Sequence, residues 1–166
     1  MFVRVIYSLI IPFIFFSQIA LSQNDCPKIY VDIINGTINN LPLTADMQQV
    51  KDSLPCFTGW TSEEDVHTNC GGGVFFLDDD FYFYTGKDYV EFRSKFKGEV
   101  SDSLLGLHPS EIERILGKSV RNEEHGSFVY IFFKTSYGCL QIRLKNDIVV
   151  SFSIHAMKAR KVDLCL

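Results

Sequence analysis

The 166-residue sequence lacks the short patterns on which common chemistries depend. It contains no Gly-x-Ser-x-Gly nucleophile elbow and no pair of histidines at the spacing of a helical zinc site. The Gly71-Gly72-Gly73 run is not followed by Lys-Ser/Thr and a helix, which excludes a phosphate-binding loop. No basic stripe is present, which argues against a nucleic-acid partner. We therefore expect no catalytic residue, no metal ion and no other cofactor.

No apolar run has the roughly 20 residues that a membrane-spanning helix needs. Residues 5–16 are nearly all apolar, follow Arg4 and precede the small residues Ala20 and Ser22, a pattern typical of a secretory signal peptide. We expect cleavage after Ser22, no membrane span afterwards, and a secreted or periplasmic location. Because no small residue immediately precedes Cys26, lipid attachment is not expected.

The predicted signal peptide covers residues 1–22 and leaves residues 23–166 as one domain. Removing Arg4 with the signal leaves 15 basic and 20 acidic residues, a net charge of −5. The remaining 144 residues suffice for one hydrophobic core.

All five cysteines lie after the predicted signal peptide, where an oxidising compartment favours disulfides over metal sites. Cys56 and Cys70 bracket a polar segment and are predicted to pair. Cys26 and Cys165 lie near the two ends of the remaining chain, ends that are often close in space, and form the second predicted pair. Cys139, inside an apolar strand, is then left as a buried free thiol.

The first half of the chain predicts a hairpin, a helix and three strands. Residues 28–40 alternate around Asn35-Gly36, which favours a type I′ turn. Apolar residues at helical spacing follow Thr44, the expected N-cap. Aromatic-rich runs at 74–77, 81–85 and 89–93 predict a three-stranded meander, and the aspartates at 78–80 fit a turn better than a calcium loop.

The second half predicts the same order of elements. A helix is expected to begin at Pro109 and end at Gly117, followed by strands over 128–134, 139–144 and 148–155. The repeated order predicts an α+β fold of two tandem helix-plus-antiparallel-sheet units, about 28–98 and 99–160, with an N-terminal β-hairpin.

The second predicted helix carries a resemblance to a known family. Residues 106–118, Gly-Leu-His-Pro-Ser-Glu-Ile-Glu-Arg-Ile-Leu-Gly-Lys, resemble the helix signature of the SmpA/OmlA (BamE-like) outer-membrane assembly lipoproteins. His108 replaces the usual Ser or Thr, and Ser119 stands where a proline is common. The layout over 28–155 resembles the tandem fold of the β-lactamase inhibitor protein. The resemblance implies an envelope or secreted protein that acts by binding other proteins.

The candidate binding residues are aromatic. Trp60, the single tryptophan, lies with Phe57 in the long polar segment 56–73, where an exposed aromatic pair would suit a protein interface. Trp60 could equally fold back over a sheet edge. Tyr82 and Tyr84 alternate with phenylalanines, so one face of that strand is expected in the core and the tyrosine face toward a partner or under the long segment.

Three functions are compatible with these patterns. The first is a non-catalytic protein-binding module of the cell envelope, inhibitor-like or immunity-like, whose partner-binding residues are Trp60, Phe57, Tyr82 and Tyr84. The second is an accessory protein in envelope assembly. The third is a small ligand-binding domain or enzyme, for which acid–base chemistry by Glu63, Glu64 or Asp65 stays open.

Overall fold

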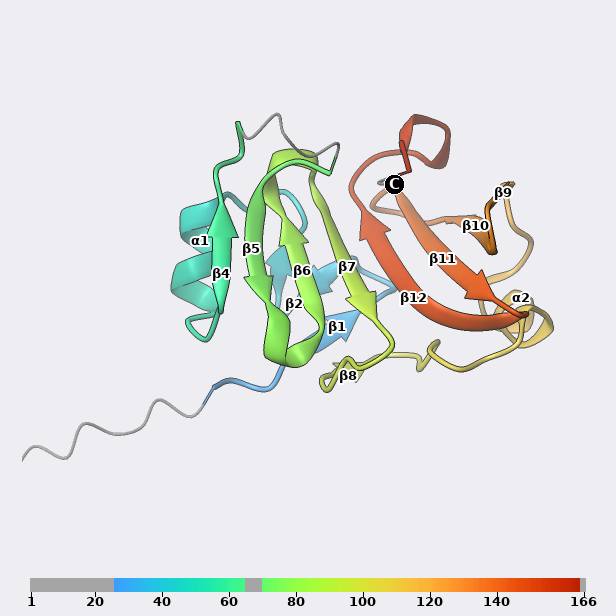
Figure 1. Ribbon diagram of the computed structural model, residues 1–166, viewed down its shortest axis with the longest axis horizontal. Helices are drawn as coiled ribbons and strands as arrows, with labels where there is room; N and C mark the ends of the chain where they lie inside the picture. The colour runs from blue at the N-terminus through green and yellow to red at the C-terminus, as the bar shows by residue number, and fades with distance from the viewer. Residues whose placement is uncertain (1–25, 65–69, 165–166) are drawn as a thin grey trace, which may run out of the picture.

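A computed structural model of the chain describes residues 26–64 and 70–164 (Figure 1). The predicted signal peptide and Cys165 lie outside these described residues. Within them, two β-sheets make up most of the regular structure, and only two α-helices are present.

The larger sheet is antiparallel and has eight strands in the order β4-β5-β6-β7-β12-β11-β10-β9. The pairing of β7 with β12 joins the strands of the first half of the chain to those of the second half. The predicted three-stranded meander is confirmed by the pairing of β5, β6 and β7. In chain order the strands are β4 (Gly59–Thr61), β5 (Gly73–Phe76), β6 (Phe81–Tyr84), β7 (Tyr89–Arg93), β9 (Arg121–His125), β10 (Phe128–Lys134), β11 (Cys139–Lys145) and β12 (Ile148–His155).

The smaller sheet has four short strands in the order β3-β2-β1-β8. These strands are β1 (Tyr30–Asp32), β2 (Thr37–Ile38), β3 (Leu41–Pro42) and β8 (Glu99–Val100). The predicted hairpin is confirmed, since β1 and β2 pair antiparallel, whereas β8 adds to β1 in parallel.

The turn of this hairpin differs from the type I′ turn expected at Asn35-Gly36. Gly36 has a φ of 68°, but Asn35 does not have a positive φ, and the Gly36 amide bonds the Asp32 carbonyl at 2.8 Å. The Asp32 carboxylate also accepts bonds from the Asn35 backbone and side chain, which hold the pKa of Asp32 below its usual value. A wider loop therefore replaces the two-residue turn because the side chain of Asp32 supplies its own acceptor.

Both helices are short. Helix α1 spans Met47–Ser53 and is capped by Asp46 rather than by Thr44, because the Asp46 carboxylate and the Gln49 side chain form a reciprocal capping box. Helix α2 spans Pro109–Leu116.

The predicted limits of α2 are confirmed. Pro109 occupies the first turn, and Gly117 ends the helix with a φ of 81°. His108 caps the helix in place of the Ser or Thr of the resembled motif, and Glu111 completes the capping box.

The predicted α+β fold of two tandem helix-plus-sheet units is wrong. The two helices have seven and eight residues, whereas the two sheets have four and eight strands, so the fold is predominantly β. Some of the strands were not predicted because they lie at sheet edges and lack alternating apolar residues. β4 and β9 are paired on one side only and carry glycine or charged side chains.

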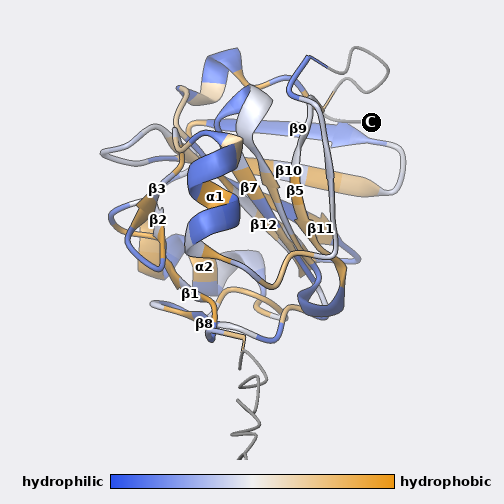
Figure 2. Cartoon of the chain, turned by 90° about the vertical axis from the view of Figure 1, so that its left-hand side faces the viewer, coloured by the Kyte–Doolittle hydropathy of each residue, from blue (hydrophilic) through white to orange (hydrophobic). Residues whose placement is uncertain are grey.

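The inner face of the eight-stranded sheet, the face turned toward the helices and the smaller sheet, carries the main hydrophobic core (Figures 1 and 2). Phe81, Phe92 and Phe152, from three adjacent strands, stack with ring-centroid separations of 5.2 and 4.8 Å. Val50 of α1 and Ile112 of α2 are buried in the same core. Burial of each such side chain contributes about 1.5–3 kcal/mol, so this face supplies most of the stability of the fold.

The disulfide pairing expected from the sequence is also wrong. Cys26 is bonded to Cys56, with a Cα–Cα distance of 5.6 Å, and Cys70 is a half-buried free thiol. The predicted pairs depend on the polar segment between Cys56 and Cys70 and on the closeness of the chain ends, and neither determines where the fold places Cys26. Cys139 is the buried free thiol that was predicted, and burial raises the pKa of its thiol to about 12.

Candidate functional site

The opposite surface of the eight-stranded sheet, called the outer face below, carries polar and aromatic side chains. The strand register places them in rows, because residues paired across neighbouring strands point to the same side of a sheet. Tyr82, Glu91, Ser153 and Gln141 form the middle row across β6, β7, β12 and β11. The flanking rows are Tyr84, Tyr89, His155 and Cys139 on one side and Arg93, Ser151, Arg143 and Tyr130 on the other.

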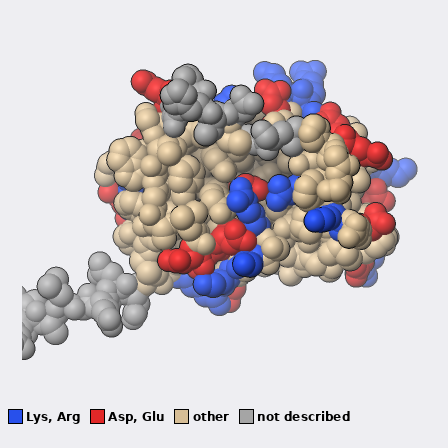
Figure 3. All heavy atoms as spheres, viewed as in Figure 1, with Lys and Arg blue, Asp and Glu red and all other residues tan. Residues whose placement is uncertain are grey.

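The C-terminal segment covers one end of the outer face. Ala159 and Val162 pack with Tyr130, Phe132 and Cys139 in a second hydrophobic cluster, separate from the main core. Between this cover and β6–β7, the outer face is hollowed into a cavity of about 80 Å³, called the outer-face cavity. Figure 3 shows basic and acidic side chains next to each other near the middle of this face.

Arg121 holds the C-terminal segment against the sheet. Its guanidinium donates to the carbonyl oxygens of Ala159 and Val162 at 2.6 and 3.0 Å, and it pairs with Glu123 at 2.6 Å. Hydrogen bonds from a charged donor are stronger than those between neutral groups, so the wall of the cavity is fixed in position.

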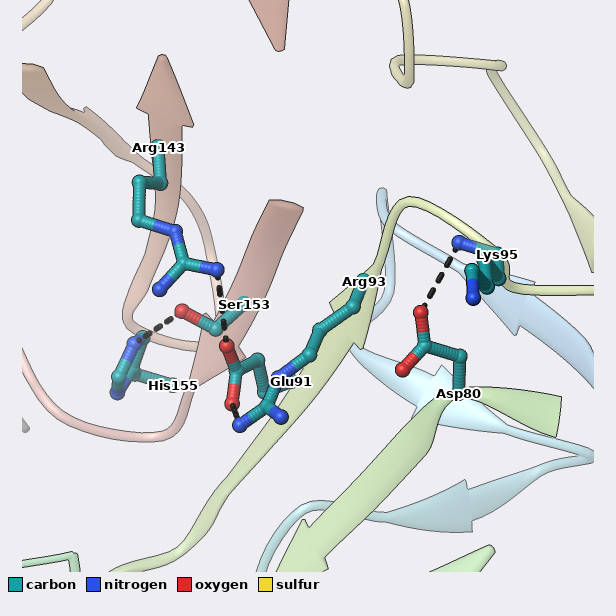
Figure 4. Close-up of polar contacts among 7 residues, drawn as sticks. All are labelled: Asp80, Glu91, Arg93, Lys95, Arg143, Ser153 and His155. Atoms are coloured by element: carbon teal, nitrogen blue, oxygen red, sulfur yellow. Dashed lines mark hydrogen bonds and ion pairs between the residues drawn. The ribbon is translucent and has the colours of Figure 1, made fainter. Parts of the chain in front are cut away.

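Two arginines share one carboxylate in the outer-face cavity (Figure 4). Glu91 Oε2 accepts a hydrogen bond from Arg93 Nη2 at 2.9 Å. Glu91 Oε1 lies 3.8 Å from Arg143 Nη2, which is an ion pair but too long for a hydrogen bond. Asp163 also lines the cavity, exposed at its rim, and forms no ion pair with either arginine. The guanidinium of Arg143 thus makes no hydrogen bond with any residue that the structure describes.

The arginine Nε atoms of this pair are buried without an acceptor among the described residues. The flat faces of both guanidiniums lie against rings, Arg93 at 4.0 Å from the Tyr82 centroid and Arg143 at 5.1 Å from that of Phe128. Burial disfavours the charge of Arg93, but the hydrogen bond and negative charge of Glu91 outweigh it and raise the pKa of Arg93. Arg93 therefore stays charged at the floor of the cavity.

A buried histidine lies in the neighbouring row of the outer face. The His155 ring stacks on Tyr89 at 4.8 Å, and Tyr89 stacks on Tyr84 at 4.4 Å. Ser153 Oγ and His155 Nε2 lie 2.9 Å apart (Figure 4). Burial lowers the pKa of His155 to about 3, so its imidazole is neutral at physiological pH.

The four predicted partner-binding residues do not come together. Trp60 is 56% exposed and pairs with Val74 on β5, which puts it on the inner side of the sheet, where Lys51 Nζ lies 3.7 Å from its ring centroid. Phe57 is half-buried and packs against the main core. Tyr82 and Tyr84 lie on the outer face, Tyr82 partly exposed and Tyr84 buried.

The charged residues of the cavity escaped the sequence-based prediction. A signal for them exists, because Glu91 and Arg93 are two positions apart on β7, as are Gln141 and Arg143 on β11. Polar residues two apart within apolar strands predict a polar sheet face. Nothing in the sequence, however, indicates that β7 and β11 are separated only by β12.

Residues 26–64 and 70–164 contain no cluster of three or more His, Cys, Asp or Glu side chains that could hold a metal ion. In the same part of the chain, no helix is long and apolar enough to cross a bilayer. The chain matches no protein-family model, no curated protein and no solved structure. The resemblance to the SmpA/OmlA lipoproteins and to the β-lactamase inhibitor protein stays a prediction.

Proposed function

We propose that this protein is an exported, non-catalytic protein-binding module whose outer-face cavity accepts an acidic side chain of the partner. The proposal depends mainly on Arg143, whose side chain is 27% exposed and makes no hydrogen bond with any described residue. Its Nε atom and that of Arg93 are buried and have no acceptor among the described residues, which costs about 1–3 kcal/mol for each unsatisfied donor. A carboxylate from a partner would supply acceptors to this donor-rich site.

The size of the cavity favours a side chain over a free ligand. Its volume of about 80 Å³ is well below the roughly 300–1,000 Å³ of small-molecule pockets. One Asp or Glu side chain, delivered from a protein surface, matches this space. Tyr82, partly exposed beside Arg93, would then contact the partner at the rim, as expected of aromatic residues at interfaces.

The Ser153–His155 pair resembles a nucleophile next to a base, but its environment argues against catalysis. A pKa of about 3 makes His155 a weak base at neutral pH, whereas general-base catalysis works best near the operating pH. Both side chains are also almost fully buried, at 5% and 4% exposure. We therefore assign this pair to the packing of the outer face.

Trp60 and Phe57 stay predicted partner contacts, but on the other side of the sheet from the outer-face cavity. Lys51 lies against both rings, 3.7 Å from that of Trp60 and 5.7 Å from that of Phe57. Trp60 therefore gives a matched control, because its loss would remove an exposed aromatic group without touching the arginines.

The proposal is tested with random peptides displayed on phage and selected for binding to the purified protein. We expect the selected peptides to share an Asp or Glu at a fixed position. Their affinity should fall at least tenfold, equivalent to about 1.4 kcal/mol, for Arg143→Gln, and stay within twofold for Trp60→Ala.

Two outcomes would overturn the proposal. One is a set of peptides without a shared acidic residue. The other is a set whose binding is lost with Trp60→Ala and kept with Arg143→Gln, which would move the binding surface to the inner side of the sheet. Circular dichroism of both variants checks that neither substitution unfolds the protein.

A further inference from the structure

A second and larger cavity lies at the end of the β10–β11 hairpin, away from the arginine pair of the proposed partner site. It has a volume of about 680 Å³ and is called the basic cavity below. One wall is the turn from Lys134 to Gly138, and the other is the C-terminal segment that includes the 3-10 turn Ala159–Lys161. Figure 3 shows Lys and Arg side chains gathered over this C-terminal turn.

The charged side chains that line the basic cavity are all basic in the part of the chain that the structure describes. They are Arg121, Lys134, Lys158 and Arg160, with no Asp or Glu from residues 26–64 or 70–164. The chain as a whole has a net charge of −4, so a cavity lined by four basic side chains has the opposite sign of charge from the chain. A cavity lined by one sign of charge concentrates counter-ions of the other sign.

Three of these cations have no carboxylate partner among the described residues. Arg121 is paired with Glu123 and holds the carbonyls of the C-terminal segment, so its role is to position the cavity wall. Lys134, Lys158 and Arg160 are exposed and form no ion pair with any carboxylate that the structure describes. Their charges repel one another unless an anion lies between them.

The wall formed by the turn from Lys134 to Gly138 is held rigidly. Tyr137 Oη donates to the Ile33 carbonyl at 3.0 Å, and the Gly138 amide donates to Thr135 Oγ1 at 3.1 Å. A Cβ on Gly138 would lie only 2.2 Å from the His155 carbonyl oxygen, so the turn packs too closely for any larger residue. Such a fixed wall lowers the entropy cost of binding.

We propose that the basic cavity binds a small polyanion, a molecule with two or more phosphate or carboxylate groups. Its volume falls within the roughly 300–1,000 Å³ of small-molecule sites, several times the space that a single side chain fills. Lysines suit phosphate as point charges, and arginine adds paired hydrogen bonds to phosphate or carboxylate.

Titration of the protein with pyrophosphate and, separately, with citrate tests this proposal. Binding is followed by calorimetry and by amide NMR shifts at about 50 mM salt. We expect dissociation constants below about 1 mM for at least one probe, with shifts concentrated at residues 134–138 and 156–160. Tighter binding of pyrophosphate would identify a phosphorylated ligand, and tighter binding of citrate a polycarboxylate.

The matched variants separate a site from general electrostatics. Lys134→Gln with Lys158→Gln should weaken binding at least tenfold, whereas Lys97→Gln with Arg114→Gln, which removes the same charge outside the basic cavity, should change it less than twofold. Equal losses in the two double variants, or no binding of either probe at 10 mM, would overturn the proposal. Arg143→Gln should leave polyanion binding unchanged, so this inference can fail independently of the proposed partner site.

Discussion

The same strands form the two faces of the eight-stranded sheet, but the two faces have opposite effects on the stability of the fold. The inner positions of β5, β6 and β7 are all apolar, and the phenylalanines among them are fully buried. The outer positions of β7 hold Tyr89, Glu91 and Arg93, and two arginine Nε atoms on this face have no acceptor in the described part of the chain. The inner face therefore stabilises the fold, while the outer face retains groups that cost stability when no partner is bound.

The outer face is therefore the surface on which we expect a partner to bind. Residues that destabilise a fold are expected at functional sites, because stability alone would remove them. The phenylalanines of the inner face need no such explanation, since their burial accounts for them. Substitutions confined to one face at a time separate these two roles.

The largest effect is expected on the inner face. Phe92 is fully buried and stacks on Phe81 and Phe152, so Phe92→Ala should lower the free energy of unfolding by about 3–5 kcal/mol. Urea denaturation measures this loss. The matched outer-face variant Tyr82→Ala, on the neighbouring strand, should cost about 1 kcal/mol, because Tyr82 is partly exposed. Equal losses in the two variants would show that the outer face stabilises the fold as much as the inner face does.

The next effect concerns the Cys26–Cys56 disulfide, which borders a small cavity that Leu54 and Phe76 of the main core also line. The two cysteines are 30 residues apart in the sequence. In the chain-entropy model, a disulfide that closes a loop of that size stabilises the folded state by about 3–4 kcal/mol. Cys56→Ser should therefore lower the thermal midpoint by several degrees, while Cys70→Ser should change it little. A non-reduced peptide map that joins Cys56 to Cys70 would contradict the pairing.

The buried histidine of the outer face predicts a pH dependence. Because the pKa of His155 is about 3 in the folded protein and about 6.5 in the unfolded chain, the unfolded chain binds the extra proton between these values. His155 therefore destabilises the fold as the pH falls below about 6, by up to about 1.4 kcal/mol per pH unit.

The contribution of His155 is isolated by comparing urea denaturation of the wild type and of His155→Gln from pH 7 to pH 4. Carboxylates titrate in both proteins, so only the difference between the two slopes reports on the histidine. The wild type should lose stability more steeply than the variant. Parallel slopes would show that His155 is hydrated and titrates normally.

The sequence predicted those parts of the fold that depend on local patterns. The limits of α2 follow from Pro109 and Gly117, and the strands β10 to β12 follow from runs rich in apolar residues, which alternate with polar residues in β11. The predicted fold class was wrong for two reasons. The edge strands β4 and β9 lack alternating apolar residues. The two halves of the chain are joined in one sheet by the long-range pairing of β7 with β12, which no local pattern indicates.

The candidate site was harder to predict for the same reason. Glu91 and Arg143 are 52 positions apart in the sequence, and they meet only because β7 and β11 both flank β12. The single tryptophan, Trp60, is predicted to share a binding surface with Tyr82, but its strand pairing places it on the opposite side of the sheet. Composition thus identified residue types suited to binding, whereas the register decided which of them share a face.

The smallest expected effect on stability concerns Arg143, and it distinguishes the two faces most sharply. Its charge contact is a 3.8 Å ion pair with Glu91, and its guanidinium lies 5.1 Å from the Phe128 ring. Such partly exposed contacts contribute about 1 kcal/mol or less, and Arg143→Gln also removes a buried donor for which residues 26–64 and 70–164 supply no acceptor. The free energy of unfolding should therefore change by less than about 1 kcal/mol in urea denaturation. A loss as large as that of Phe92→Ala would instead make Arg143 a structural residue, and the outer face would then have to be treated as a second core.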